Sequence, residues 1–308
     1  MKTIKHVDVK KRMYVNDLVK EMSQSGVFGA GRIAKAADII EDMFKDKECK
    51  VFLGIAGAMV PGGMKNIIID MLNSRYIDAI VTTGATLTHD LAEALGYKHY
   101  IGTAHADDSE LHRKGFDRMY DSYMPNKVYE SLEKFFNSIL ENMHKKINIK
   151  EFLWYIGKHV KSKDSILRVC YEKQIPIFCP GIADSGIGLM IWGNLVKGKK
   201  IDVNVFDDLK EIIDIAWTAK KRGFIYIGGG VPKNYIQQAM QFSKEGADYG
   251  VQITTDMPEY GGSSGAELRE GISWGKLKEN AKFVDVYCDA TIALPLIYAA
   301  VKDRLKWF

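Results

Sequence analysis

The sequence predicts an α/β protein with a doubly wound, mostly parallel sheet that is flanked by helices. Three observations support this prediction. Short apolar runs alternate along the chain with longer helix-patterned segments, as in folds built from strand–helix–strand units. Most of these runs are apolar on both faces, which is typical of parallel strands covered by helices on each side. Several runs are followed by glycine-rich turns, where a chain commonly reverses direction.

Six apolar runs are the expected strands. In chain order they are "KVFLGIA" (50–56), "DAIVTT" (78–83), "IPIF" (175–178), "FIYIG" (224–228), "YGVQIT" (249–254) and "FVDVYC" (283–288). Between them lie helix-patterned segments, of which 125–146 and 205–223 are two clear examples. Each of these two ends near Lys, Arg or Gly, as helices tend to do.

The length of 308 residues suits one large α/β domain or two smaller ones. Hydrophobic residues make up 46% and charged residues 27% of the chain, so it can bury a sizeable core. No Pro/Ser-rich linker and no internal repeat interrupts the pattern. We therefore expect a single domain over 1–308, with an N-terminal helical extension over about 1–48.

Composition argues against several classes of protein. The net charge of +4 is spread without a basic block, which gives no reason to expect nucleic acid or an anionic membrane as a partner. The chain has no apolar stretch of about 18 residues and no continuous apolar region near its start, so we expect neither a membrane span nor a signal peptide. Its four cysteines form no CxxC pair, which fits a reducing cytoplasm and argues against a metal site such as zinc.

Glycine-rich turns follow four of the expected strands, at 54–63, 82–90, 180–188 and 228–234. In open parallel sheets the crevice beyond the carboxyl ends of the strands is the usual ligand site. Glycine lets the backbone approach a ligand closely, and the helix starts that follow favour phosphate. One such turn is ordinary chain reversal, but four together favour a phosphate-bearing cofactor.

A separate "GAGRIA" at 29–34 matches the dinucleotide fingerprint GxGxxA. The residues before it do not form a convincing buried strand, so the strand–turn–helix context that the fingerprint requires is missing. We expect these residues to begin a helix instead, with glycine allowing close packing.

Six segments occur in one order and resemble the deoxyhypusine synthase family over nearly the whole chain. They are "VTTGA" (81–85), the triple glycine at 228–230, "GADYGVQITT" (246–255), "GGSSGA" (261–266), "SWGK" (273–276) and "VYCDAT" (286–291). The Ser-Trp-Gly-Lys element with the downstream Asp-Ala is specific to that family, whereas the glycine turns alone are not. The resemblance implies a Rossmann-like NAD-binding architecture.

The resemblance also implies a definite reaction. Family members use NAD to oxidise spermidine at a carbon beside its secondary amine, and the aminobutyl fragment then moves onto an enzyme lysine. From there it passes to an acceptor amine, and NADH reduces the product. The acceptor is a lysine of the hypusine-containing translation factor, or putrescine in related homospermidine-forming enzymes. Family members are homotetramers with active sites shared between paired subunits, which the resemblance implies here too.

Lys276 matches the lysine that carries the aminobutyl group. An amine nucleophile must be neutral, which requires its pKa to be lowered from about 10.4 by burial or by a neighbouring positive charge. Trp274 can supply an apolar wall and, in the family, packs along the polyamine. An isolated Trp-Gly-Lys would more simply be a core tryptophan beside a solvated lysine. The surrounding family motifs favour the catalytic interpretation.

The cofactor positions carry over one at a time. The triplet Thr83, Gly84 and Ala85 matches a turn at the cofactor, Gly229 matches a glycine beneath it, and Asp289 with Ala290 matches a pair that holds part of the NAD. Asp289 could equally cap the end of its strand, and Asp184 could bind a ribose hydroxyl. The remaining cofactor positions are Thr255, which is followed by Asp256 where the family has alanine, Ser264, and Gly57 and Ala58, which lie where the family often has Ser-Asn.

The substrate side departs from the family pattern. Glu270 matches a carboxylate that faces the polyamine, but Leu189 and Ser263 replace two family carboxylates that clamp ammonium groups. Asn234 replaces a histidine that assists the chemistry. His89 replaces a glutamate at the junction of cofactor and substrate, and it could be a general base or a helix-start residue bonded to Asp90.

These substitutions leave more than one function open. The amine slot could take a smaller or less charged amine, or acids from elsewhere could substitute, with Asp256, Glu259 and Glu267 near in sequence. Transfer of an aminobutyl group from spermidine to the translation-factor lysine is the leading hypothesis. The alternatives are a homospermidine synthase-like transferase acting on putrescine or another small amine, and a noncatalytic NAD- or polyamine-binding homologue.

Overall fold

A computed structural model gives the structure of the protein, and it describes residues 1–143 and 146–305. The chain divides into two compact units. Unit 1 comprises Met1–Ala56, Tyr76–Val81 and Lys210–Phe308, and unit 2 comprises Gly57–Arg75 and Thr82–Leu209. The expectation of a single domain stays a prediction, because two compact units can still fold as one.

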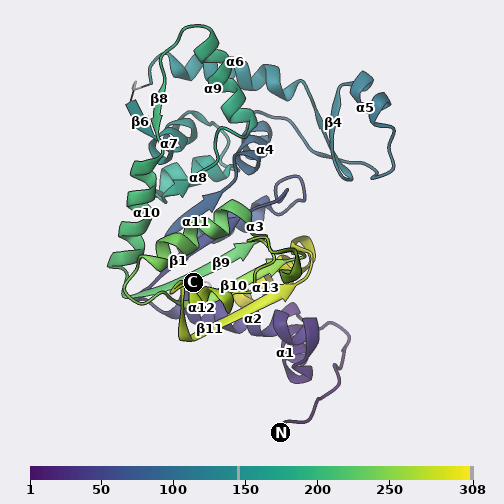
Figure 1. Cartoon of the computed structure of the whole chain (residues 1–308). Coiled ribbons are helices and arrows are strands. Elements are labelled where there is room, and N and C mark those ends of the chain that lie inside the picture. The colour runs from purple at the N-terminus through teal and green to yellow at the C-terminus, as the bar shows by residue number, and fades with distance from the viewer. Residues whose placement is uncertain (144–145, 306–308) are drawn as a thin grey trace. The chain divides into compact units, whose positions relative to one another are not determined.

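Unit 1 is built on a parallel sheet (Figure 1). Its strands lie in the order β11, β10, β9, β1 and β2. The pairs β1–β9, β9–β10 and β10–β11 are parallel, as the apolar runs predict. The bounds of these strands are Cys49–Ile55 for β1, Ala79–Thr82 for β2, Lys221–Ile227 for β9, Ala247–Thr254 for β10 and Leu277–Tyr287 for β11.

Helices cover both faces of this sheet, which confirms the doubly wound architecture. A Cβ placed on Gly223 would meet Met43 of α2, whereas one placed on Gly54 would meet Ile236 of α11. Gly54 pairs with Tyr226, three residues after Gly223, and successive residues of a strand face opposite sides. The helices of unit 1 are α1 (Val15–Ser25), α2 (Phe28–Lys45), α11 (Gly230–Gln241), α12 (Glu270–Ser273) and α13 (Ala290–Leu305), with the 3₁₀ turn η1 at Pro258–Tyr260. A further helix, α10 (Phe206–Thr218), has residues in both units.

An aromatic pair fills the α11 side of the sheet. The rings of Phe224 and Tyr226 stack with centroids 4.4 Å apart, and both residues are buried. Glycines flank them on the neighbouring strands. A Cβ on Gly54 would lie 2.9 Å from the Tyr226 ring and 3.2 Å from Ile236, and a Cβ on Gly250 would lie 2.6 Å from the Phe224 ring. The two glycines therefore make room for a ring layer that supports α11.

Unit 2 is mostly helical, with two small sheets (Figure 1). Strands β3, β4 and β5 form an antiparallel sheet, and β6 pairs in parallel with β8. The sequence patterns did not predict these sheets. The elements are α3 (Lys65–Asn73), α4 (Gly84–Ala94), β3 (Tyr100–Ile101), α5 (Asp108–Lys114), β4 (Phe116–Met119), β5 (Ser122–Pro125), α6 (Val128–Leu140), β6 (Lys146–Asn148), α7 (Ile149–His159), α8 (Ile166–Lys173), β7 (Ile177–Phe178), α9 (Gly186–Val196) and β8 (Asp202–Asn204).

Two expected helices have different bounds in the structure. The pattern over 125–146 corresponds to the shorter α6. The pattern over 205–223 corresponds to α10, which ends at Thr218, so the expectation was wrong for 221–223, which begin β9. The difference arises at Arg222, which looks like a basic helix terminus but is buried. Its guanidinium donates hydrogen bonds to the carbonyls of Gly246, Ala216 and Lys220 at 3.0–3.3 Å.

The "GAGRIA" segment starts a helix, as expected, because α2 begins at Phe28 and runs through it. A Cβ on Gly31 would lie 2.4 Å from the backbone of Gly26, so this glycine serves close packing. Among the described residues, no helix combines the length and the apolar character that crossing a membrane requires.

A buried carboxylate joins two helices of unit 2. Asp90 of α4 is fully buried and accepts hydrogen bonds from the Ser165 hydroxyl at 2.8 Å and from the amides of Ile166 and Leu167 at 2.9 and 3.1 Å. These amides belong to the first turn of α8, whose N–H groups have no partner within the helix. Asp90 thereby fixes the start of α8 against α4.

We expect Asp90→Ala to lower the free energy of unfolding by about 3 kcal/mol, because three buried donors lose their acceptor at once. Urea denaturation of the variant and the wild type measures the difference. Asp107→Ala is the matched control, since it removes an exposed cap of α5 and should cost about 1 kcal/mol. Equal losses in the two variants would contradict the role given to Asp90.

Candidate active site

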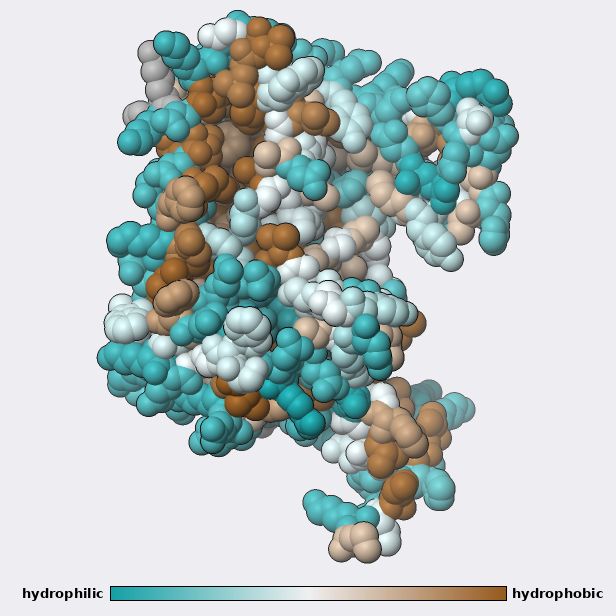
Figure 2. Space-filling model, in the orientation of Figure 1, coloured by the Kyte–Doolittle hydropathy of each residue, from teal (hydrophilic) through white to brown (hydrophobic). Residues whose placement is uncertain are grey.

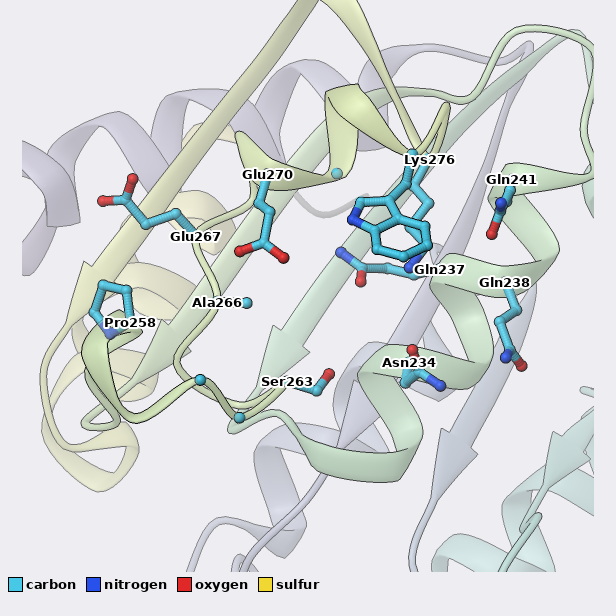
Figure 3. A pocket seen from close by; sticks show the side chains of 14 residues that line it. Asn234, Gln237, Gln238, Gln241, Pro258, Ser263, Ala266, Glu267, Glu270 and Lys276 are labelled. Atoms are coloured by element: carbon cyan, nitrogen blue, oxygen red, sulfur yellow. The ribbon is translucent and has the colours of Figure 1, made fainter.

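A cavity of about 370 Å³ lies in unit 1 between α11 and the segment from Pro258 to Lys276 (Figure 3). It gathers five predicted site residues in one place: Asn234, Ser263, Glu270, Trp274 and Lys276. Those residues come from three separate stretches of the chain, so their meeting is a result of the fold. The other lining residues are Gln237, Gln238, Gln241, Pro258, Gly261, Gly262, Ala266, Glu267 and Gly271.

One wall of the cavity is a row of side-chain amides on α11 (Figure 3). Asn234, Gln237, Gln238 and Gln241 follow the spacing i, i+3, i+4, i+7, which places them on one face of the helix. Each amide offers both hydrogen-bond donors and an acceptor, without a formal charge. This wall can therefore orient a polar ligand through hydrogen bonds.

The opposite wall supplies the negative charge. Glu270 and Glu267 both line the cavity, and the carboxylate of Glu270 points into it (Figure 3). Of the three acids expected to compensate for lost carboxylates, Glu267 lines this cavity, whereas Asp256 and Glu259 are not among its lining residues. The Glu267 carboxylate also accepts a hydrogen bond from the Tyr287 hydroxyl at 3.2 Å. The Glu270 carboxylate, which faces a row of amides, suits a cationic ligand.

Lys276 lies against the ring of Trp274. Its Nζ is 4.7 Å from the centroid of that ring, within the range of a cation–π contact. Trp274 is 56% exposed, so it is not the core tryptophan of the simpler interpretation, and Lys276 is half-buried. Gly275 turns the chain at a φ of +68° between them, and the Lys276 amide donates to the Gly271 carbonyl at 2.8 Å. The backbone therefore holds both side chains at the cavity.

A second lysine, Lys233, lies close to the cavity and was missed from the sequence. It is 1% exposed, and its Nζ donates to the Ala266 carbonyl at 2.5 Å. Burial lowers the pKa of Lys233 to about 8; Asp285 and Glu270 act in the opposite direction, and Lys276 lowers it further. The signal was available in the spacing of Lys233, Ile236 and Met240, which share the buried face of α11.

The predicted cofactor residues of unit 1 lie at the carboxyl ends of its strands. Gly229 follows β9, Thr255 follows β10, and Asp289 with Ala290 follows β11. Ser264 contacts the turn that follows β9, because its hydroxyl accepts a hydrogen bond from the Gly230 amide at 2.9 Å. Asp289 accepts one from the Thr291 amide at 2.8 Å, which supports its interpretation as a cap.

Four of the predicted cofactor residues of unit 2, Thr83, Gly84, Ala85 and Asp184, lie at two helix starts. Thr83 caps α4 by accepting a hydrogen bond from the Thr86 amide at 3.3 Å. A Cβ on Gly84 would lie 2.4 Å from Cβ of Ser185, the residue that caps α9, so the starts of α4 and α9 lie side by side. Asp184, just before that cap, is exposed, as is Ala85 of α4, and Gly57 turns the chain at a φ of +80° beside Ala58.

His89 and Leu189 also belong to unit 2. The expectation that His89 could bond Asp90 was wrong, because Asp90 is engaged by Ser165 and α8. The His89 ring instead meets His99, with Nδ1 and Nε2 3.0 Å apart. Leu189 is 53% exposed on α9, within an apolar patch seen on the surface in Figure 2 and made with Trp192, Leu195 and Val196.

Comparison with known proteins shows that the chain is similar to members of one family. The family model for deoxyhypusine synthase matches residues 17–301. A Methanosarcina thermophila protein named "Probable deoxyhypusine synthase" is 44% identical over 305 residues, covering 98% of this chain and 95% of that protein. "Probable deoxyhypusine synthase 1" of Archaeoglobus fulgidus is 43% identical over 297 residues, covering 96% and 97%.

Among solved structures, a "putative deoxyhypusine synthase from Entamoeba histolytica" superposes with a TM-score of 0.67. The two sequences are 20% identical, and the match covers 99% of each chain. At this identity the likeness concerns the fold, and it agrees with the α/β architecture predicted from the sequence.

Lys233 gives a prediction about pH. Its pKa is about 8 in the folded protein and about 10.5 when unperturbed, so between these values the unfolded chain holds more protons. The cost of burying the ammonium is present below pH 8 and is relieved as the pH rises. We expect wild type to gain up to about 3 kcal/mol relative to Lys233→Met between pH 7 and 10.5.

Denaturant unfolding of both proteins across this range measures the difference. Lys282→Met, on the exposed part of β11, controls for the loss of one lysine from the chain. A stability of wild type relative to Lys233→Met that stays constant or falls as the pH rises would contradict the burial of a lysine with a lowered pKa.

Proposed function

The chain belongs to the deoxyhypusine synthase family of transferases, and from this premise we propose its reaction. It transfers an aminobutyl group from spermidine, by way of a covalent adduct on Lys276, to a lysine of the hypusine-containing translation factor. One observation carries the proposal: Lys276 and Trp274 line the same cavity as Glu270, whose carboxylate suits a cationic amine. The chemistry follows from how these groups bind the donor and accept its fragment.

Donor binding uses charge and an apolar surface on one wall and uncharged amides on the other. An ammonium group pairs with Glu270, and Glu267 is available for a second one. The exposed face of Trp274 offers an apolar surface for the methylene chain of a polyamine. The amides of Asn234 and Gln238 hydrogen-bond to the remaining N–H groups without adding charge.

Lys276 is the carrier. In its neutral form the amine adds to the carbon of the oxidised donor, and the departing amine leaves with a proton. The fragment is then attached to Nζ through a carbon–nitrogen double bond, ready for attack by the acceptor amine. Trp274 holds the lysine chain beside the cavity throughout. We propose Lys276 as nucleophile and Trp274 and Asn234 as the residues that position the donor.

NAD is the proposed cofactor, and when bound it would take a hydride from the donor and return it to the product. Two sets of residues each fit part of a dinucleotide. In unit 1, Gly229, Thr255 and Asp289 lie at the strand ends where such ligands bind. In unit 2, the adjacent starts of α4 and α9 favour phosphate, and the exposed Asp184 carboxylate suits ribose hydroxyls.

Assembly and location are also proposals. The exposed apolar residues of α9, Leu189, Trp192, Leu195 and Val196, form a surface of the kind that subunits cover. This supports the homotetramer that family resemblance implies. We also propose a cytoplasmic location, which fits four cysteines that are all free among the described residues.

Trapping tests the carrier role of Lys276. Incubation with NAD, spermidine and borohydride should leave a reduced aminobutyl adduct on Lys276, read by peptide mass spectrometry. Lys276→Arg keeps the charge but should abolish the adduct, because guanidinium is not a nucleophile at neutral pH. Lys282→Arg is the matched control and should be modified like wild type. An adduct on any other lysine, or none with any polyamine, would overturn the assignment.

A substitution that should strengthen spermidine binding tests the proposed amine-binding residues. Ser263 is exposed and lines the cavity, so Ser263→Asp restores a carboxylate without disturbing a core. We expect KM for spermidine to fall about tenfold, equivalent to about 1.4 kcal/mol, with a smaller effect on putrescine, which carries fewer charges. Ser263→Asn is the uncharged control.

An equal change for both donors would show that charge at this position does not select the amine. The same assay with putrescine as acceptor tests a homospermidine-forming reaction. The uncharged Ser263 and Leu189 are the observations that favour this alternative.

A further inference from the structure

Four titratable side chains form a continuous chain in unit 2. The ammonium of Lys65 pairs with the carboxylate of Glu93. The other oxygen of that carboxylate lies 2.8 Å from Nδ1 of His99, and Nε2 of His99 lies 3.0 Å from Nδ1 of His89. All four belong to the same unit, so their contacts are internal to it. Their side chains are mostly covered, with His99 7% and Lys65 13% exposed.

The contacts among these four side chains determine which nitrogen atoms carry protons. Burial alone would raise the pKa of Glu93, but the hydrogen bonds from His99 and Lys65 outweigh it and hold the pKa at about 2. Glu93 is therefore an ionised acceptor, so Nδ1 of His99 must donate to it. With His99 neutral, its Nε2 has only a lone pair and must accept from Nδ1–H of His89. This leaves Nε2 of His89 as a lone pair, which is the form of a base.

The arrangement also decides which ring carries a positive charge. Burial lowers the pKa of His89 to about 4, and the neighbouring His99 lowers it further. His99 instead lies in direct contact with the Glu93 carboxylate. A proton that reaches Nε2 of His89 is therefore passed on: the Nδ1 proton of His89 moves to Nε2 of His99. His89 ends neutral with its proton on Nε2, and His99 ends as an imidazolium beside Glu93.

We propose that Glu93, His99 and His89 form a proton relay whose open end is Nε2 of His89. Within the described residues, that nitrogen makes no hydrogen bond, and the His89 residue is half-buried rather than enclosed. Glu93 and His99 act through His89 and are positioning residues, and Lys65 holds the carboxylate in place. One proton enters at His89 and one charge appears at His99, so the transfer balances without another reactant.

Among the neighbouring charged groups, Asp90 of α4 is coupled to the relay, because burial raises its pKa and the charge of Lys65 lowers it. Of the helices packed against α4, α8 presents Ser165 and its first amides to Asp90. Helices α6 and α9 pair Glu133 with Lys197. Of the described charged groups, His99 lowers the pKa of His89 and Glu93 raises it.

The use of the relay rests on the proposed function. An amine that attacks must first give up the proton of its ammonium form, and a lone pair on Nε2 of His89 can take it. The acceptor for that proton is then His99, through one step of the relay. A base of this kind contributes about 10²- to 10⁴-fold to the rate of an amine transfer.

Nitrogen NMR of the seven histidines of the intact wild-type chain tests the relay without requiring activity. We expect His89 and His99 both in the Nδ1–H form at high pH. On acidification, His99 should become doubly protonated while His89 switches to the Nε2–H form and stays neutral, both in one step. Separate steps, or His89 in the Nε2–H form at high pH, would overturn the proposal.

His159 is an internal control in the same spectra. Its Nδ1 lies 2.8 Å from the Tyr155 carbonyl, which can only accept a hydrogen bond. Nδ1 of His159 should therefore stay protonated throughout, and this ring should not pass into the neutral Nε2–H form. The variants His89→Gln and His99→Gln assign the signals by loss. In Glu93→Gln, the common step should move by at least one pH unit, because the imidazolium loses its counter-charge.

A kinetic arm tests the use of the relay. We expect His89→Gln to lower the rate of adduct formation on Lys276 by about 10²-fold with little change in KM. His99→Gln should remove the acidic limb of the pH profile, and His159→Gln should leave it unchanged. A profile for His99→Gln that superimposes on wild type would overturn the catalytic use. If wild type forms no adduct, the proposed function fails, and the NMR result alone decides the relay.

Discussion

The cavity depends on a layer of two aromatic rings on one face of the sheet. Phe224 and Tyr226 stack there because Gly54 and Gly250, on the strands at either side, carry no Cβ to obstruct them. The space above Gly54 is also bounded by Ile236 of α11, and that above Gly250 by Leu268, which precedes Glu270. The same layer therefore supports both walls of the cavity. A larger side chain at Gly54 or Gly250 would clash both with an aromatic ring of this layer and with a residue that supports a wall of the cavity.

Much of the candidate site could be predicted because the family resemblance marks its positions. Trp274 and Lys276 belong to the "SWGK" element, Glu270 matches a family carboxylate, and Asn234 stands in place of a family histidine. The structure brings all of them to one cavity. The small sheets of unit 2 could not be predicted, since strands of two to four residues that are half exposed carry no apolar alternation. Their pairing depends on partners elsewhere in the chain.

Single residues escaped prediction for a related reason: their surroundings come from distant segments. The spacing of Lys233 places it on the buried face of α11, but its hydrogen-bond partner, the Ala266 carbonyl, belongs to a distant segment. Arg222 looks like the end of a helix until three carbonyls enclose its guanidinium. His89 could be considered only with its neighbour in sequence, Asp90, whereas its partner His99 is ten residues further along. In each case the decisive contact is tertiary.

The amide wall of α11 has a consequence for how fast a cationic ligand arrives. Four amides hydrogen-bond at short range but create little field at a distance, so among the residues that line this cavity Glu267 and Glu270 attract a cation from afar and Lys276 opposes them. Screening over about 8 Å at physiological ionic strength reduces every such attraction in proportion, so two charges lose less attraction energy in absolute terms than a dense acidic slot does. Capture of the amine would thus be governed by diffusion and local fit, and it would vary little with salt.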